Sequence, residues 1–243
     1  MFRHHFELRE TIATILADEE VVINIACDGI RKARHEIERY IIHDPFFNIS
    51  LEPIAIENGP DIILKMAAAS LKAGVGPMAV VAGAVAHAGI SAAQKKGAVF
   101  CIIDNGGDIA MVTDRTVRVG LYAGNSSLSG KYAFLIPPKK EMFGICTSSA
   151  TVGHSFSFGT ADSVTVFSSD PILADAVATA VCNSLSVADQ SCLDDIDTEI
   201  EGIFAVFGEQ SITWGDIPPI IRAENREELI TAGGLGFFPG KSI

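Results

Sequence analysis

Asp175 and Thr179 have the residue types and the spacing of one half of a metal site. They lie four residues apart in LADAVATA (173–180), which the sequence predicts to be helical, so both side chains project from one helix face. Their oxygens suit Mg²⁺, which commonly takes its remaining ligands from water and from the phosphates of a bound nucleotide. The ordinary alternatives are a carboxylate stabilised by the helix dipole and a threonine hydroxyl bonded to the preceding turn. We predict a magnesium site completed by a ligand, with Asp175 also a candidate catalytic carboxylate.

A polar segment before this helix contains His154. The run that starts at residue 144 is rich in Gly, Ser and Thr and predicts a loop, and residues 162–167 predict a buried strand. Asp170 and Pro171 then mark the start of the helix, as an N-cap and a first-turn proline. A histidine among hydroxyl groups titrates near neutral pH. His154 is therefore a candidate donor to a pyrophosphate or a general acid or base, and a structural, hydrogen-bonded histidine is the alternative.

A double-glycine turn lies upstream of both features. Residues 98–103 and 109–112 predict two strands, and Asn105, Gly106, Gly107 and Asp108 join them as a hairpin turn. Glycines leave backbone N–H groups exposed and let the phosphates or the ring of a ligand approach the main chain closely. We predict that this turn contacts a ligand.

Together these segments resemble the ApbE family, in consistent order over roughly residues 60–185. In that family an Asp-Ala-x-x-Thr run supplies magnesium ligands, and a Thr-Ser stretch followed by a histidine lies beside bound FAD. The resemblance assigns metal binding to Asp175 and Thr179, and catalysis to His154 and Asp175. By the same resemblance, the cofactor-binding residues are Asn105, Gly106, Gly107, Asp108, Thr147, Ser148, Ser149 and His154.

The resemblance implies FAD and Mg²⁺, with transfer of FMN to a threonine of a protein acceptor or hydrolysis of FAD to FMN and AMP. Two family features differ here: Ala82 and Gly83 stand where a lysine-glycine pair is usual, and GHSFSFG replaces the His-x-x-Asp-Pro-x-x-Gly loop. The alternative is a non-catalytic, ligand-binding or accessory protein. At family level, a divergent branch in anaerobic archaea and bacteria is associated with sulfur assimilation towards homocysteine.

Composition narrows the classes of partner. A formal charge of -12 and a pI near 4.8, with no basic stripe, argue against nucleic acid. Five cysteines without metal-finger spacing, and an N-terminus without an apolar leader, predict a cytoplasmic protein. The uncharged stretch 73–94 is rich in Ala and Gly and predicts a buried helix rather than a membrane span. The oligomeric state stays open, a homo-oligomer included.

The expected fold class is α+β, with antiparallel or mixed sheets, packed helices and, by the resemblance, two related α/β halves in a single domain over 1–243. Strand-like runs at 6–16 and 20–26 predict an opening hairpin. Further expectations follow along the chain. Helices are predicted from Asp28 to about His43, from Pro60 to Ala73, from Pro77 to about residue 96 and within 188–202. Strands are predicted at 117–122 and 132–136. The segment 44–54 predicts a loop or a short strand.

Overall fold

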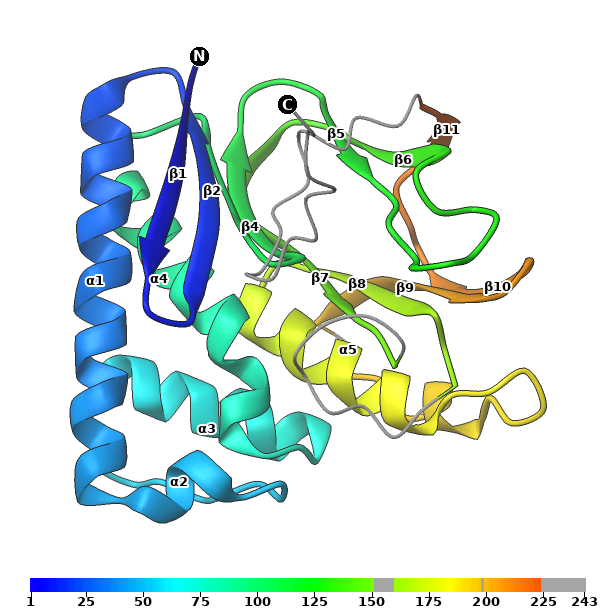
Figure 1. Cartoon of the computed structure of the whole chain (residues 1–243), viewed down its shortest axis with the longest axis horizontal. Helices are drawn as coiled ribbons and strands as arrows, with labels where there is room; N and C mark the ends of the chain where they lie inside the picture. Colours follow the sequence, from blue (N-terminus) through cyan, green and yellow to red (C-terminus); the bar gives the residue numbers. More distant parts are fainter. Residues whose placement is uncertain (151–159, 198, 224–243) are drawn as a thin grey trace, which may run out of the picture.

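An eight-stranded sheet is the middle layer of the computed structural model, which describes residues 1–150, 160–197 and 199–223 (Figure 1). Its strand order is β1-β2-β3-β4-β7-β8-β9-β10, and neighbouring strands are antiparallel throughout. The strands are β1 (Phe2–Leu8), β2 (Thr11–Ala17), β3 (Cys101–Asn105), β4 (Asp108–Thr113), β7 (Lys139–Ser148), β8 (Ser163–Ser168), β9 (Ile200–Phe207) and β10 (Gln210–Gly215).

Helices cover one face of this sheet and a small sheet covers the other. The helical segments are α1 (Glu20–His43), α2 (Pro45–Ile49), α3 (Asp61–Ala73), the 3-10 turn Pro77–Val80, α4 (Val81–Gln94), α5 (Pro171–Ser184) and the 3-10 turn Ser191–Leu193. The small antiparallel sheet has the order β11-β6-β5, with β5 (Val117–Gly120), β6 (Tyr132–Ile136) and β11 (Ile220–Arg222).

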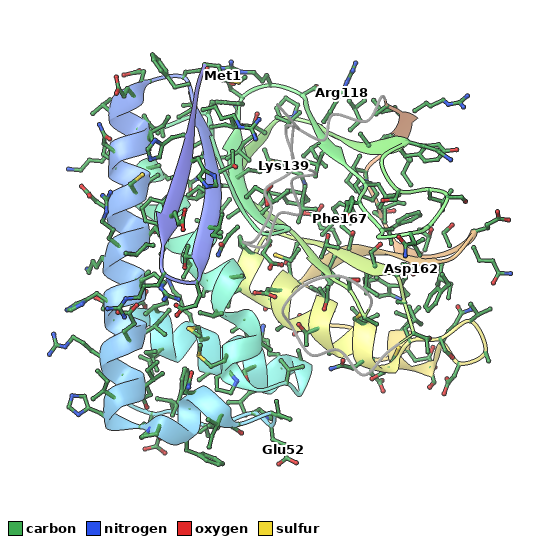
Figure 2. All side chains as sticks on the ribbon, viewed as in Figure 1. Met1, Glu52, Arg118, Lys139, Asp162 and Phe167 are labelled. Carbon is green, nitrogen blue, oxygen red and sulfur yellow. The ribbon has the colours of Figure 1, made fainter. Side chains whose placement is uncertain are left out.

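The strand side chains show how the layers are joined. Successive residues of a strand point to opposite faces, so Ile103 packs in the cluster under the helices while Ile102 packs in the cluster under the small sheet. Phe167 on β8 lies between the two sheets, where its ring meets that of Phe134 edge-on at 4.9 Å (Figure 2). Each face of the large sheet therefore has its own apolar core.

The large sheet consists of two halves with the same order of elements. In the first half β1 and β2 are followed by the helical segment α1–α4 and then by β3 and β4; in the second, β7 and β8 are followed by α5 and then by β9 and β10. The halves meet where β4 pairs with β7, and α4 contacts α5 across the same line. The α+β class, the antiparallel sheets and the two related halves expected from the sequence are confirmed.

The Gly/Ala helix is a core element. The window Pro77–Gln94 is long and apolar enough to cross a membrane by length and composition alone, but half of it is buried inside the fold. α4 packs against α1, α5, β3 and β4. A Cβ on Gly89 would lie 2.4 Å from the side chain of Ile103, so a small residue is required where the helix meets the sheet. This agrees with the buried helix predicted from its composition.

The opening hairpin predicted from the sequence is wrong in position. The turn is at Arg9 and Glu10, between β1 and β2, and residues 20–26 begin the 24-residue helix α1. The buried residues Ile23, Ala26 and Ile30 of α1 recur at helical spacing, and this longer period overrides the strand-like appearance of EVVINIA.

Three further segments differ from expectation. Residues 44–54 include the short helix α2, whose N-cap Asp44 accepts a hydrogen bond from the N–H of Phe46. Residues 144–148 belong to β7 rather than to a loop. Among the described residues of 188–202, only Ser191–Leu193 is helical. The Asp189 side chain accepts a hydrogen bond from the N–H of Ser191, and the Asp197 side chain accepts one from the N–H of Glu199. Both bonds stabilise turns in place of a longer helix.

Candidate active site at the junction of the two halves

The first turn of α5 packs directly on α4 and β7. As predicted, Asp170 caps the helix by accepting a hydrogen bond from the N–H of Ile172 at 2.9 Å, and Pro171 opens the first turn. Two glycines allow the close approach: a Cβ on Gly83 would lie 2.6 Å from the Pro171 carbonyl oxygen, and a Cβ on Gly144 would lie 2.5 Å from the Pro171 Cα. The start of α5 is therefore fixed against both halves of the fold.

Asp175 points into this junction. Its side chain is buried, and its Oδ2 accepts a hydrogen bond from the backbone N–H of Gly83 at 2.8 Å. Burial raises the pKa of the Asp175 carboxyl to about 7, and the Gly83 N–H opposes that rise only in part. The bond joins residues 92 positions apart and orients the carboxyl.

Asp108 supplies a second carboxyl beside the first. It opens β4 and pairs in register with Cys146 on β7. The residue keeps some exposed surface, but its carboxyl is enclosed by protein. This burial is the main cause that raises the pKa of the carboxyl well above the usual range, and the charges of Asp175 and Asp104 raise it further. The nearby Cys146 thiol and Thr147 backbone N–H act in the opposite direction and lower the pKa of this carboxyl in part.

The two carboxyls have no basic partner in the described part of the chain. None of the ion pairs found there includes Asp108 or Asp175. Two neighbouring buried carboxyls cannot both ionise without a compensating charge, so they keep a proton or bind a cation. This pair is the most unusual electrostatic feature of the junction.

The double-glycine turn lies next to the pair. Gly106 and Gly107 have φ angles of 71° and 106°, and the N–H of Gly107 donates to Asp104 Oδ1 at 3.0 Å. The Asn105 amide donates to the carbonyl of Ala82 at 3.1 Å, which ties the turn to the residue before Gly83. A Cβ added to Gly106 would meet no atom of the described residues within 4 Å, so among them a ligand can approach the turn from that side.

The predicted Thr-Ser stretch lies at the end of β7. The Thr147 hydroxyl lies 3.0 Å from the Thr165 hydroxyl on β8, and the Ser149 hydroxyl donates to the carbonyl of Asp162 at 2.7 Å. Ser148 is half-buried between them. Two of the three hydroxyls are thus used within the sheet, while the main chain of Thr147 faces Asp108.

Of the last two predicted residues, Thr179 and His154, only Thr179 lies in the described part of the chain. Thr179 lies one turn beyond Asp175 on α5 and is half-buried. His154 lies outside the described residues. Among the residues that are described, no group of three or more His, Cys, Asp or Glu side chains could hold a metal, so a cation here would need oxygens from a hydroxyl, the main chain or a ligand.

Gly83 and Cys146 are two residues of the junction to which the sequence assigned no role. The sequence marks Gly83 only through the Ala82-Gly83 pair, which stands where the ApbE family usually has lysine-glycine, and a glycine inside a helix indicates close packing without naming the partner. Cys146 is buried, and that burial, reinforced by the nearby Asp108, raises the pKa of its thiol well above the usual range. Its Sγ lies 3.3 Å from the Pro171 carbonyl oxygen. Cys146 is therefore a neutral thiol that donates to the Pro171 carbonyl and lies close to Asp108.

Comparison with known proteins identifies the family. A family model described as "AbpE bacteria" matches residues 2–214. The chain belongs to this family. Relatives named "UPF0280 protein" include one from Methanospirillum hungatei JF-1, 81% identical over 99% of both chains, and one from Methanoculleus marisnigri, 54% identical over the full length of both.

Solved structures show the same fold at low sequence identity. The apo flavinyl transferase ApbE of Pseudomonas stutzeri is 12% identical, covers 96% of this chain and 97% of its own, and superposes with a TM-score of 0.58. The flavin transferase ApbE of Vibrio cholerae is 11% identical, covers 88% of this chain and 96% of its own, and has a TM-score of 0.51. At this identity the likeness establishes the ApbE-like fold.

The AbpE-family chain has a donor set that fits a magnesium ion. The carboxyls of Asp108 and Asp175 and the hydroxyl of Thr179 offer only oxygen, which Mg²⁺ prefers. A divalent cation would also balance two buried carboxyls that have no basic partner among the described residues. The open side of Gly106 suits the phosphate end of a nucleotide.

Proposed function

We propose that this protein is a Mg²⁺-dependent enzyme that acts on the pyrophosphate of FAD or of a related nucleotide. The reaction is transfer of FMN to a hydroxyl group of a protein acceptor, or hydrolysis to FMN and AMP. The observation that carries the proposal is the enclosed pair Asp108 and Asp175, without a basic partner in the described structure, beside an open glycine turn. The ApbE-like fold, shared with the flavin transferases ApbE of Pseudomonas stutzeri and Vibrio cholerae, supports it.

Each residue of the junction has a definite task in this reaction. Asp175, held by the N–H of Gly83, and Asp108, which lies beside Thr147 and Cys146, would bind the metal, with Thr179 as a further ligand. When bound, Mg²⁺ neutralises the charge that develops on the pyrophosphate oxygens. The acceptor oxygen bonds to the FMN phosphorus as the bond to AMP breaks. We assign His154 to the proton that the acceptor loses.

A second candidate is a protein that keeps the fold and binds a ligand without turnover, as an accessory in sulfur assimilation towards homocysteine. Ala82, in the place of the lysine usual in the ApbE family, favours it, because its carbonyl is bonded to Asn105 and its side chain has no charge to offer a flavin. Release of AMP from FAD, in the presence of a protein acceptor or of water alone, separates the two functions, since the accessory protein would bind FAD and release it unchanged.

A thermal-shift measurement with FAD tests the enzyme. At a hundred times its Kd a ligand stabilises a protein by about 2.7 kcal/mol, which raises the Tm of a chain this size by about 5 °C or more. We expect this rise with Mg²⁺ and a smaller one with a chelator. Asp175→Asn should remove the difference, whereas the exposed control Asp194→Asn should keep it. An FAD response equal in chelator, or unchanged in Asp175→Asn, would refute the proposal.

The setting we propose is a single domain over 1–243 that works in the cytoplasm, with neither nucleic acid nor a membrane as partner. Five cysteines, none of which forms a disulfide in the described structure, the net charge of -12 and the half-buried apolar helix support this setting.

A further inference from the structure

The edge strand β10 leaves main-chain groups unpaired. It is the last strand of the large sheet, and a two-residue turn at Gly208 and Glu209 joins it to β9, with Gln210 opposite Phe207. The pair that flanks such a turn exchanges both main-chain hydrogen bonds, and bonded and non-bonded pairs then alternate. Ser211 and Thr213 therefore direct their N–H and C=O groups away from β9, to the open side.

This edge lacks the features that usually prevent another strand from pairing. The strand QSITWG has no charged residue and no proline, and both Ser211 and Thr213 are exposed. The opposite edge, β1, carries charged and titratable side chains at Arg3, His4, His5 and Glu7. Within the described residues, β10 is thus the more accessible edge of the sheet.

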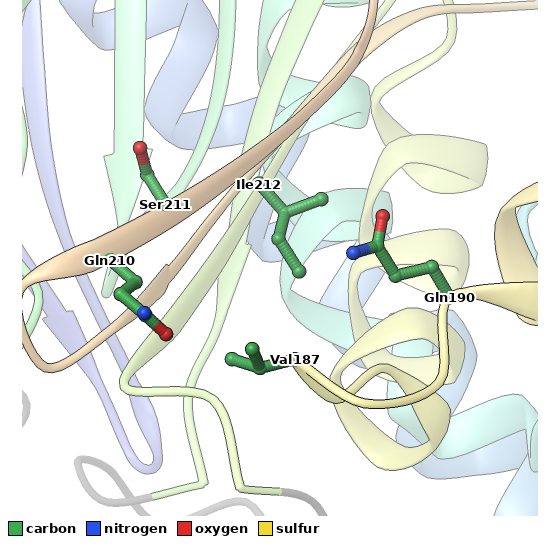
Figure 3. Close-up of a pocket in the computed structure, with 5 residues that line it drawn as sticks. All are labelled: Val187, Gln190, Gln210, Ser211 and Ile212. Carbon is green, nitrogen blue, oxygen red and sulfur yellow. The ribbon is translucent and has the colours of Figure 1, made fainter.

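A hollow of about 380 Å³ lies beside β10 (Figure 3). The loop after α5 contributes Val187 and Gln190 to it, and β10 contributes Gln210, Ser211 and Ile212. Figure 3 shows the side chains of Ile212 and Val187 pointing towards one another, with the two glutamines on either side. Its lining is neutral, with the apolar side chains of Val187 and Ile212 between two glutamine amides, and a side chain of an added strand could enter it.

The surrounding charge determines what can pair with this edge. Residues 185–217 contain eight Asp and Glu and no Lys or Arg. Lys72 forms ion pairs with Asp197 and Glu199, and Lys139 with Glu201. The other five carboxylates, which are in none of the ion pairs of the described structure, are Asp189, Asp194, Asp195, Glu209 and Asp216. A second copy of the chain would bring the same negative charge against this edge, which disfavours self-pairing.

We propose that the β10 edge binds an extended, basic peptide segment of another protein, which adds a ninth strand to the large sheet. The main-chain groups of Ser211 and Thr213 pair with the peptide, as in other cases of strand addition. Because side chains alternate along a strand, the peptide places a neutral residue in the hollow and basic residues beside Glu209 and Asp216. This binding requires neither the metal nor the nucleotide of the proposed function.

Fluorescence anisotropy with a labelled seven-residue peptide of alternating lysine and valine tests the proposal. We expect saturable binding that weakens with salt, and no binding of the same peptide with glutamate in place of lysine. Thr213→Pro removes an outward N–H without removing a bond to β9, and should weaken binding about tenfold. The matched control Thr213→Val keeps that N–H and should bind like the parent chain.

A second measurement uses the unaltered protein and so does not depend on how the proline variant folds. Two versions of the peptide carry N-methyl groups on alternate residues, odd in one and even in the other. Strand addition predicts that one version loses binding and the other keeps it, since only alternate amides face β10. The proposal is overturned if the lysine peptide does not bind, if both methylated versions bind equally, or if light scattering shows a dimer that Thr213→Pro dissociates.

Discussion

Replacing Asp175 by asparagine should change how the stability of the protein depends on pH. The substitution preserves the size of the side chain and an oxygen that can accept the Gly83 N–H, but it removes the group that titrates. In the parent chain, burial raises the pKa of Asp175 from 3.8 to about 7. The folded state thus holds a proton that the unfolded state releases, and stability is lost as the pH rises through this window.

The expected size follows from the same two values. A pKa difference of one is worth about 1.36 kcal/mol, so the rise from 3.8 to about 7 corresponds to about 4 kcal/mol lost over the whole window. About 2.3 kcal/mol of it falls between pH 5 and pH 7, because the folded-state carboxyl is half titrated at the upper limit. Asp108, with a pKa that is also raised, acts in the same direction. This is a large share of the roughly 5–15 kcal/mol that keeps a domain folded.

Urea unfolding of both chains between pH 5 and pH 8, in chelator, measures the effect. We expect the variant to gain about 2.3 kcal/mol relative to the parent chain between pH 5 and pH 7, and the difference to level off above that. Taking the difference cancels the acidic groups whose pKa is lowered, such as Asp61 and Asp189. A difference that stays constant with pH would refute the enclosed, uncompensated carboxyl pair.

Three further outcomes are expected. Gly83→Ala should cost about 1–3 kcal/mol in urea unfolding, because the new Cβ would lie 2.8 Å from that of Asp175, whereas Gly120→Ala, with nothing within 4 Å, should be nearly neutral. Asn105→Ala should cost about 1 kcal/mol in the same assay, through its lost bond to Ala82. A maleimide should label the native chain at Cys192 alone, and Cys192→Ser should abolish that labelling, since the other four thiols are buried.

The parts of the fold that the sequence predicted are those with local signals. Asp170 and Pro171 cap and open α5, and Gly74, with φ of 71°, ends α3; each acts within one turn of its own element. The hairpin of β3 and β4 was predicted from the same kind of signal, because Gly106 and Gly107 allow the φ angles its turn requires. Residues that fix their own neighbourhood can be interpreted without the rest of the chain.

Where packing decides, the sequence misled or gave no signal. The segment around Thr147 appeared to be a loop, yet it completes β7 because Thr147 pairs with Thr165 on β8. The bond from Gly83 to Asp175 links two helices that no local pattern connects. The turn and the helix were each predicted to be functional, but the proximity of Asp108 and Asp175 follows from the pairing of β4 with β7 and the contact of α4 with α5.

The position of the carboxyl pair favours a ligand-binding role over a structural one. A well-packed apolar pair would stabilise the junction at least as well, since buried carboxyls without a basic partner oppose folding. Asp108 lies on β4, in the first half of the sheet. Asp175 lies on α5, which follows β8 in the second half, so each half supplies one carboxyl to the same point. A cation bound there would hold the halves together through both carboxyls, and its affinity would offset the stability that they cost without it.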